Sequence, residues 1–108
     1  MPNVFKSVFS KNVPPSTGVT LYTSPNGTTS VIKSLYTANT SGSTAGVDVF
    51  VGASGSATAF YIIKDARVPT QSTLQAITEP IVLRQGDKIF VQPSVSGVDA
   101  VLSFMEVS

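Results

Sequence analysis

The stretch that decides the fold reads Val47-Asp48-Val49-Phe50-Val51, in which valines alternate with other side chains. Successive side chains of a β-strand point to opposite faces, so this period of two predicts a strand with one face in a core. Clusters of Gly, Ser and Thr follow and precede it, and the same unit of apolar run and turn cluster recurs along the chain. No stretch has the apolar spacing of an amphipathic helix over eleven or more residues. The sequence therefore predicts an all-β protein.

Further strands are expected on both sides of this run, separated by turn residues such as those of Pro25-Asn26-Gly27. A total of about eight or nine strands folds most readily as two packed antiparallel sheets. We therefore expect an antiparallel β-sandwich, either jelly-roll or immunoglobulin-like. The other expected strands cover residues 18–23, 28–39, 57–64, 73–77, 81–83, 88–92 and 100–107, with a turn at 52–56.

The leading residues have a different character, and we divide the chain into an extended N-terminal arm, 1–17, and a β-sandwich domain, 18–108. The run Val13-Pro14-Pro15-Ser16-Thr17 ends the arm, because Pro-Pro continues neither a helix nor a central strand. The arm is either an edge strand of its own sandwich, a segment that packs on a neighbouring subunit or scaffold, or a disordered tail. We expect its large apolar residues to form a protein interface: Val4, Phe5, Val8 and Phe9.

The composition of the 108 residues fits a single domain whose surface is partly covered by partners. Charged residues make up 12% of the chain, about half the usual fraction of roughly 25%. The net charge is +1 and the charges are scattered, so no basic stripe indicates a nucleic-acid partner. No apolar run approaches the roughly 20 residues of a membrane helix, and the N-terminus does not resemble a secretion signal. We expect no membrane contact and synthesis in a cytoplasm.

The residue types that most enzymes and metal sites need are scarce. The chain has no His and no Cys, so the commonest general base and the usual zinc ligands are absent. The acidic residues are dispersed, and no calcium loop or phosphate-binding glycine motif occurs. We expect no enzyme activity, no metal and no cofactor; an enzyme would need a cleft in which carboxylates converge.

The tyrosines are the candidate aromatic residues for sugar binding, since the chain has no Trp. Tyr22, Tyr36 and Tyr61 fall in expected strands among apolar neighbours, which favours packing on or within a sheet. Tyr22 and Tyr36 could also form an exposed pair across the turn at 25–27. Such a pair would suit a carbohydrate-binding module, and this alternative stays open.

Three runs resemble segments of small virion structural proteins of tailed bacteriophages, and the resemblance extends from about residue 19 onward. It lies in the pattern of strands and turns, not in a catalytic motif. The runs are Val31-Ile32-Lys33-Ser34-Leu35-Tyr36-Thr37-Ala38-Asn39-Thr40-Ser41-Gly42; Val68-Pro69 with Ser72-Thr73-Leu74 and Pro80-Ile81-Val82-Leu83-Arg84-Gln85-Gly86-Asp87-Lys88-Ile89-Phe90-Val91; and Val101-Leu102-Ser103-Phe104-Met105-Glu106-Val107-Ser108.

The resemblance implies a capsid decoration (cement) protein that binds the head lattice through protein–protein contacts, or else a neck, tail or fibre component. It also implies a homo-oligomer, with a trimer favoured, that contacts the major capsid protein or another virion protein. The location would be the virion, assembled in the host bacterial cytoplasm. No functional residue is transferred, because such proteins offer no defined site to match.

Overall fold

The computed structural model describes residues 3–15, 17–53, 55 and 58–107. This part of the chain forms nine β-strands and contains no helix, hence none that could span a membrane. The all-β prediction is confirmed. The strands are β1 (Asn3–Ser10), β2 (Val19–Thr23), β3 (Thr29–Asn39), β4 (Ala45–Gly52), β5 (Ala59–Val68), β6 (Ser72–Ile77), β7 (Ile81–Leu83), β8 (Lys88–Pro93) and β9 (Val98–Val107).

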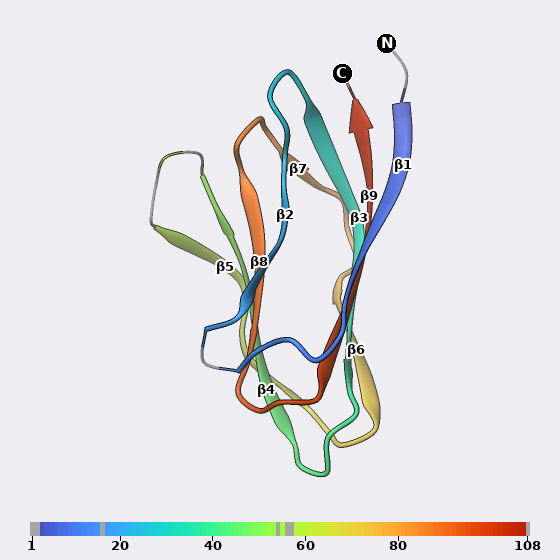
Figure 1. Ribbon diagram of the computed structural model, residues 1–108, viewed down its shortest axis with the longest axis vertical. Coiled ribbons are helices and arrows are strands. Elements are labelled where there is room, and N and C mark those ends of the chain that lie inside the picture. Colours follow the sequence, from blue (N-terminus) through green and yellow to red (C-terminus); the bar gives the residue numbers. More distant parts are fainter. Residues whose placement is uncertain (1–2, 16, 54, 56–57, 108) are drawn as a thin grey trace.

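The strands form two antiparallel sheets that face each other, which confirms the expected β-sandwich (Figure 1). The β1 sheet has the order β1-β9-β3-β6, with β7 also paired to β3, and the β2 sheet has the order β2-β8-β4-β5. Early strands thus pair with late ones: β1 with β9, β2 with β8, β3 with β6 and β7, and β4 with β5. The chain is a long hairpin wound into two sheets, which is the jelly-roll arrangement.

The core lies between the sheets and follows the period of two. Val47 and Val49 of β4 are fully buried, as the alternation predicts, and they share one core cluster with Leu35 of β3 and Leu102 of β9. Val13 is also fully buried, and its N–H donates to the carbonyl oxygen of Val98 at 2.7 Å. The segment that follows β1 is therefore anchored in the core just before the Pro-Pro break.

One end of the sandwich is held by a buried amide, that of Asn39 at the end of β3. Its Nδ2 donates to the carbonyl oxygens of Ser43 at 2.8 Å and of Val68 at 2.9 Å. Its Oδ1 accepts from the Ser41 N–H at 3.0 Å and from the Ser41 Oγ at 2.6 Å. Every polar atom of this side chain is bonded, so Asn39 ties the 40–44 loop to the end of β5.

Several strands extend beyond the bounds that the sequence predicts. β5 continues to Val68, past the expected end at residue 64, and β9 begins at Val98. In β5 the register with β4 shifts twice, and Asp65 has a φ of 53°. Such β-bulges interrupt the alternation without ending the strand. Some positions of the expected elements lie outside the described residues. They are 1, 2 and 16 in the arm, 54 and 56 in the turn at 52–56, 57 at the start of a strand, and 108.

Candidate interaction surface

The four apolar residues of the expected arm lie in β1, which is an edge strand of the β1 sheet and pairs with β9 over its full length. Phe5 and Phe9 are 73% and 74% exposed, and Val4 is also exposed. Val8 points inward and packs against the core. The structure thus uses one of these side chains for folding and leaves three at the surface.

Pairing across the sheet brings Phe5 and Phe9 into two apolar rows on the outer face, the side of the β1 sheet that points away from the core. Side chains directly opposite each other on paired strands share a face. The Phe5 row consists of Phe5, Met105, Val31 and Val82, and the Phe9 row of Phe9, Val101 and Tyr36. Between them runs a row of three serines: Ser7, Ser103 and Ser34.

The two rows hold most of the large apolar side chains that the described residues expose. Of eight such side chains, five belong to the rows: Phe5, Val82, Phe9, Val101 and Tyr36. Contiguous exposed apolar surface on a soluble domain typically marks a site of protein contact. The outer face is therefore the strongest candidate for an interaction surface in this part of the chain.

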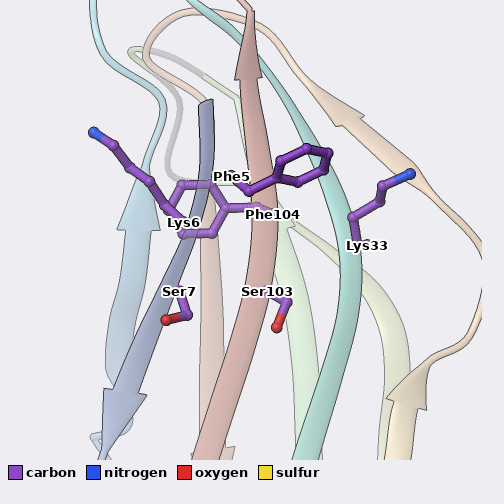
Figure 2. Close-up of a pocket in the computed structure, with 6 residues that line it drawn as sticks. All are labelled: Phe5, Lys6, Ser7, Lys33, Ser103 and Phe104. Atoms are coloured by element: carbon purple, nitrogen blue, oxygen red, sulfur yellow. The ribbon is translucent and has the colours of Figure 1, made fainter. Parts of the chain in front are cut away.

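A shallow hollow of about 320 Å³ opens beside the Phe5 row and is shown in Figure 2. Phe5 of β1 and Lys33 of β3 flank it, and Ser7 and Ser103 lie on neighbouring strands. Lys33 falls where the β3–β9 register shifts between Ile32 and Ser34. The hollow is lined by two aromatic rings, two serine hydroxyls and two lysines, which suits a partner side chain rather than a buried small molecule.

A hydrogen-bonded network on the inner side of β1 neutralises the strand's one charged residue. The Lys6 Nζ lies 2.9 Å from Glu106 Oε1, and the Tyr22 hydroxyl donates to Glu106 Oε2 at 2.5 Å. The same hydroxyl lies 2.6 Å from Ser30 Oγ, and the Tyr22 ring packs on Phe104 with centroids 4.0 Å apart. The network joins β1, β2, β3 and β9, so it fixes the exposed edge strand to both sheets.

The network shifts two pKa values in opposite directions. The hydrogen bond from Tyr22, with help from Lys6, lowers the pKa of Glu106. Burial, together with the hydrogen bond to Glu106, raises the pKa of Tyr22 to about 12. Tyr22 therefore stays protonated, and keeps donating to Glu106, well above the usual range of a phenol.

This shift predicts an alkaline loss of stability that depends on Tyr22. The pKa of Tyr22 is higher in the folded than in the unfolded chain, so its contribution is complete below pH 10 and declines between pH 10 and about 12. We expect Tyr22→Phe to flatten the decline in the free energy of unfolding over that interval. Urea unfolding at a series of pH values measures it, with Tyr61→Phe as the control; an unchanged slope in Tyr22→Phe would contradict the assignment.

The structure does not bring Tyr22 and Tyr36 together as an exposed pair. Tyr22 lies in the β2 sheet with its ring half-buried against Phe104, whereas Tyr36 lies on the outer face of the β1 sheet in the Phe9 row. Residues 24–28 pass from one sheet to the other instead of closing a hairpin. A sugar platform built from these two side chains is therefore not present.

The other sheet carries an aromatic row that the sequence analysis missed. Phe50 of β4 stacks on Phe90 of β8, with ring centroids 4.8 Å apart, and contacts Tyr61 of β5 at 5.1 Å. The Lys64 Nζ sits 4.5 Å from the centre of the Tyr61 ring. The alternation at 47–51 could have indicated this row, because it places Phe50 on the face opposite the buried valines.

Two carboxylates meet in a second hollow of about 270 Å³, but both are already bonded. Asp48 accepts the Asp65 N–H at 2.6 Å and pairs with Lys64 at 3.4 Å, while Asp65 pairs with Arg67 at 3.2 Å. These bonds hold the bulged part of β5 in place. Among the described residues no group of three or more acidic side chains is positioned to hold a metal ion.

Comparison with known proteins shows the fold. No protein-family model matches this sequence, and no curated protein matches it. A chain of the infectious bursal disease virus particle superposes with a TM-score of 0.56 at 13% identity, covering 96% of this chain and 30% of the viral one. A chain of particles derived from the same virus gives a TM-score of 0.55 at 12% identity, with coverage of 97% and 30%.

A bacterial protein gives a match of similar quality over nearly its whole length. A chain of the disulfide-linked pili of Bacillus endospore appendages superposes with a TM-score of 0.55 at 15% identity, covering 98% of this chain and 88% of the pilus chain. The present chain thus spans less than a third of the viral chains that it resembles, but most of the pilus chain. The chain is therefore similar in fold to chains of a virus particle and of a bacterial pilus.

Proposed function

We propose that this protein is a structural component of a virus particle, and specifically a decoration (cement) protein bound to the head of a tailed bacteriophage. The observation that carries the proposal is the outer face, where the Phe5 and Phe9 rows expose two bands of apolar surface on either side of the serine row. Such a surface suits protein contact. When the contact is repeated by the symmetry of a lattice, multivalency makes modest attachments durable.

Two further observations support this role. The sequence resembles small phage virion proteins over most of its length, and the fold is shared with a chain of an animal-virus particle. The proposed partners are the major capsid protein, or another virion protein, and further copies of this chain.

The test is the presence and the number of copies of this protein in purified phage particles, measured by quantitative mass spectrometry. A copy number comparable to that of the major capsid protein is expected for decoration of the head. Absence from the particles would overturn the proposal. In reconstitution with undecorated heads, we expect Phe5→Ser/Phe9→Ser to lose attachment. Phe60→Ser, which alters an exposed Phe outside the rows, should bind normally.

A fibre, tail or neck component is the second candidate, and one observation favours it. The pilus chain from Bacillus spore appendages matches this chain over 88% of its own length, so a jelly roll of this size can be the whole subunit of a filament. Those pili are disulfide-linked, whereas this chain has no Cys and would need non-covalent contacts. A copy number far below that of the major capsid protein would favour this candidate.

A further inference from the structure

Each sheet of a sandwich has two edges, and three of the four edges here are protected against pairing with another chain. β5 is bulged and carries Lys64, Asp65 and Arg67. β2 has five residues and a register shift between Thr20 and Tyr22. The edge formed by β6 and β7 is interrupted at residues 78–80, which include Pro80. Bulges, charges, short strands and prolines are the usual means of keeping edges unpaired.

At the fourth edge, β1, a single charge is the only one of these protections. Asn3–Ser10 is eight residues long, pairs with β9 without a register shift and contains no Pro. Its single charge, Lys6, is held by Glu106 of the same chain at 2.9 Å, so two copies of the strand can approach without repulsion. A long, regular, apolar edge is a template for strand addition. Since the other edges are protected, the edge strand that a second copy offers is again β1.

We propose that β1 pairs antiparallel with β1 of a second copy, about a two-fold axis that passes midway between Ser7 of one copy and Ser7 of the other. The strand is symmetric about this residue, because Phe5 and Phe9 lie two positions on either side of it. In this register Ser7 faces Ser7 of the second copy, and Phe5 faces Phe9 of the second copy. Both residues of each aromatic pair point to the outer face, as the β1–β9 register requires.

The same register makes the surface patterns of the two copies continuous. The Phe5 row of one copy runs on into the Phe9 row of the other, and the serine rows meet at the axis. The inference builds on the proposed structural role, because it names the partner that extends the adhesive surface. A two-fold contact closes with two copies, so it accounts for a dimer and not for the trimer that the family resemblance favours.

Cross-linking tests the register directly, because the natural chain has no Cys. In Ser7→Cys, the two thiols face each other across the axis at a Cβ separation of about 5 Å, which is close enough for a disulfide with slight adjustment. In the matched control Ser10→Cys, the two thiols are about 20 Å apart along the strands. We expect mild oxidation to convert Ser7→Cys to a covalent dimer on a non-reducing gel and to leave Ser10→Cys monomeric. Equal cross-linking of the two variants would overturn the register.

Charge substitution tests the same pairing without a covalent bond. The unmodified chain should sediment at twice its mass of 11.2 kDa. Phe5→Lys/Phe9→Lys places like charges opposite each other and should weaken dimerisation about 10-fold or more. Phe5→Glu/Phe9→Lys places opposite charges there and should dimerise more strongly than the double Lys variant. Circular dichroism confirms that each variant is folded. A monomer or trimer of the unmodified chain, or equal weakening in both variants, would overturn the proposal.

These results are separable from the test of the proposed function. A protein that is abundant in phage heads but monomeric in solution, with no cross-link at position 7, would remove the two-fold contact and leave the virion role standing. A protein that forms the position 7 cross-link but is absent from phage particles would remove the virion role and leave the dimer standing.

Discussion

Asn39→Asp is expected to lower the free energy of unfolding by about 3–5 kcal/mol at neutral pH. The substitution keeps the size of the side chain but replaces its donor with an acceptor. The new oxygen would face the carbonyl oxygens of Ser43 and Val68, which the Asn39 Nδ2 now binds at 2.8 and 2.9 Å. Asn39 is 1% exposed, so water would not compensate for the lost bonds.

The penalty should depend on pH with a definite sign. Burial and the two carbonyl oxygens raise the pKa of the introduced carboxyl in the folded chain above its unfolded value of about 3.9. The folded chain then binds more protons than the unfolded chain, so stability relative to the natural protein falls as pH rises above about 4. Chemical denaturation at pH 4 and pH 7 measures the difference. Asn26→Asp, in an exposed turn, is the control; a penalty of equal size in both variants would contradict the role given to Asn39.

Gly18→Ala is expected to cost about 3 kcal/mol of stability, because two effects add at this position. Gly18 has a φ of 68°, a conformation that alanine adopts only with strain. A Cβ there would also lie 2.6 Å from the carbonyl oxygen of Val91 and 2.9 Å from the Cβ of Gln92. β2 begins at the next residue, so the close approach is imposed by its pairing with β8.

Gly27→Ala is the matched control for this prediction, since it introduces the strain without the clash. Gly27 has a φ of 73°, and a Cβ there would meet nothing within 4 Å. We expect it to cost about 1–2 kcal/mol. Thermal or urea unfolding of the two variants isolates the steric contribution as their difference. Equal destabilisation would show that the backbone beside β8 moves aside.

The strands that local pattern defines were predicted within a residue or two. The expected strand at 28–39 is β3, Thr29–Asn39, and that at 88–92 is β8, Lys88–Pro93. In both, buried and exposed side chains alternate regularly, apart from the one register shift of β3. Local alternation succeeds here because it depends only on the geometry of a single strand.

The candidate site was predicted only in part, because its other members are brought together by strand pairing. The sequence identified Phe5 and Phe9, but nothing local connects them with Val82 or with Val101. Those neighbours follow from the register of β1 with β9 and of β9 with β3, and a shift of one residue would turn them to the opposite face. The Tyr22–Tyr36 pair failed for the related reason that strands adjacent in sequence belong to different sheets.

Pairing of the first strand with the last has a consequence for the timing of assembly. Asn3 lies opposite Val107, so β1 has no partner in its own sheet until residues 98–107 have left the ribosome. Contacts between such distant segments form late in folding, because closing a long loop precedes any gain from them. During translation, the phenylalanines of β1 would be unfolded and open to chaperones. The strand gains a free, regular edge only when β9 has docked, so self-association through β1 has to follow the folding of its own sheet.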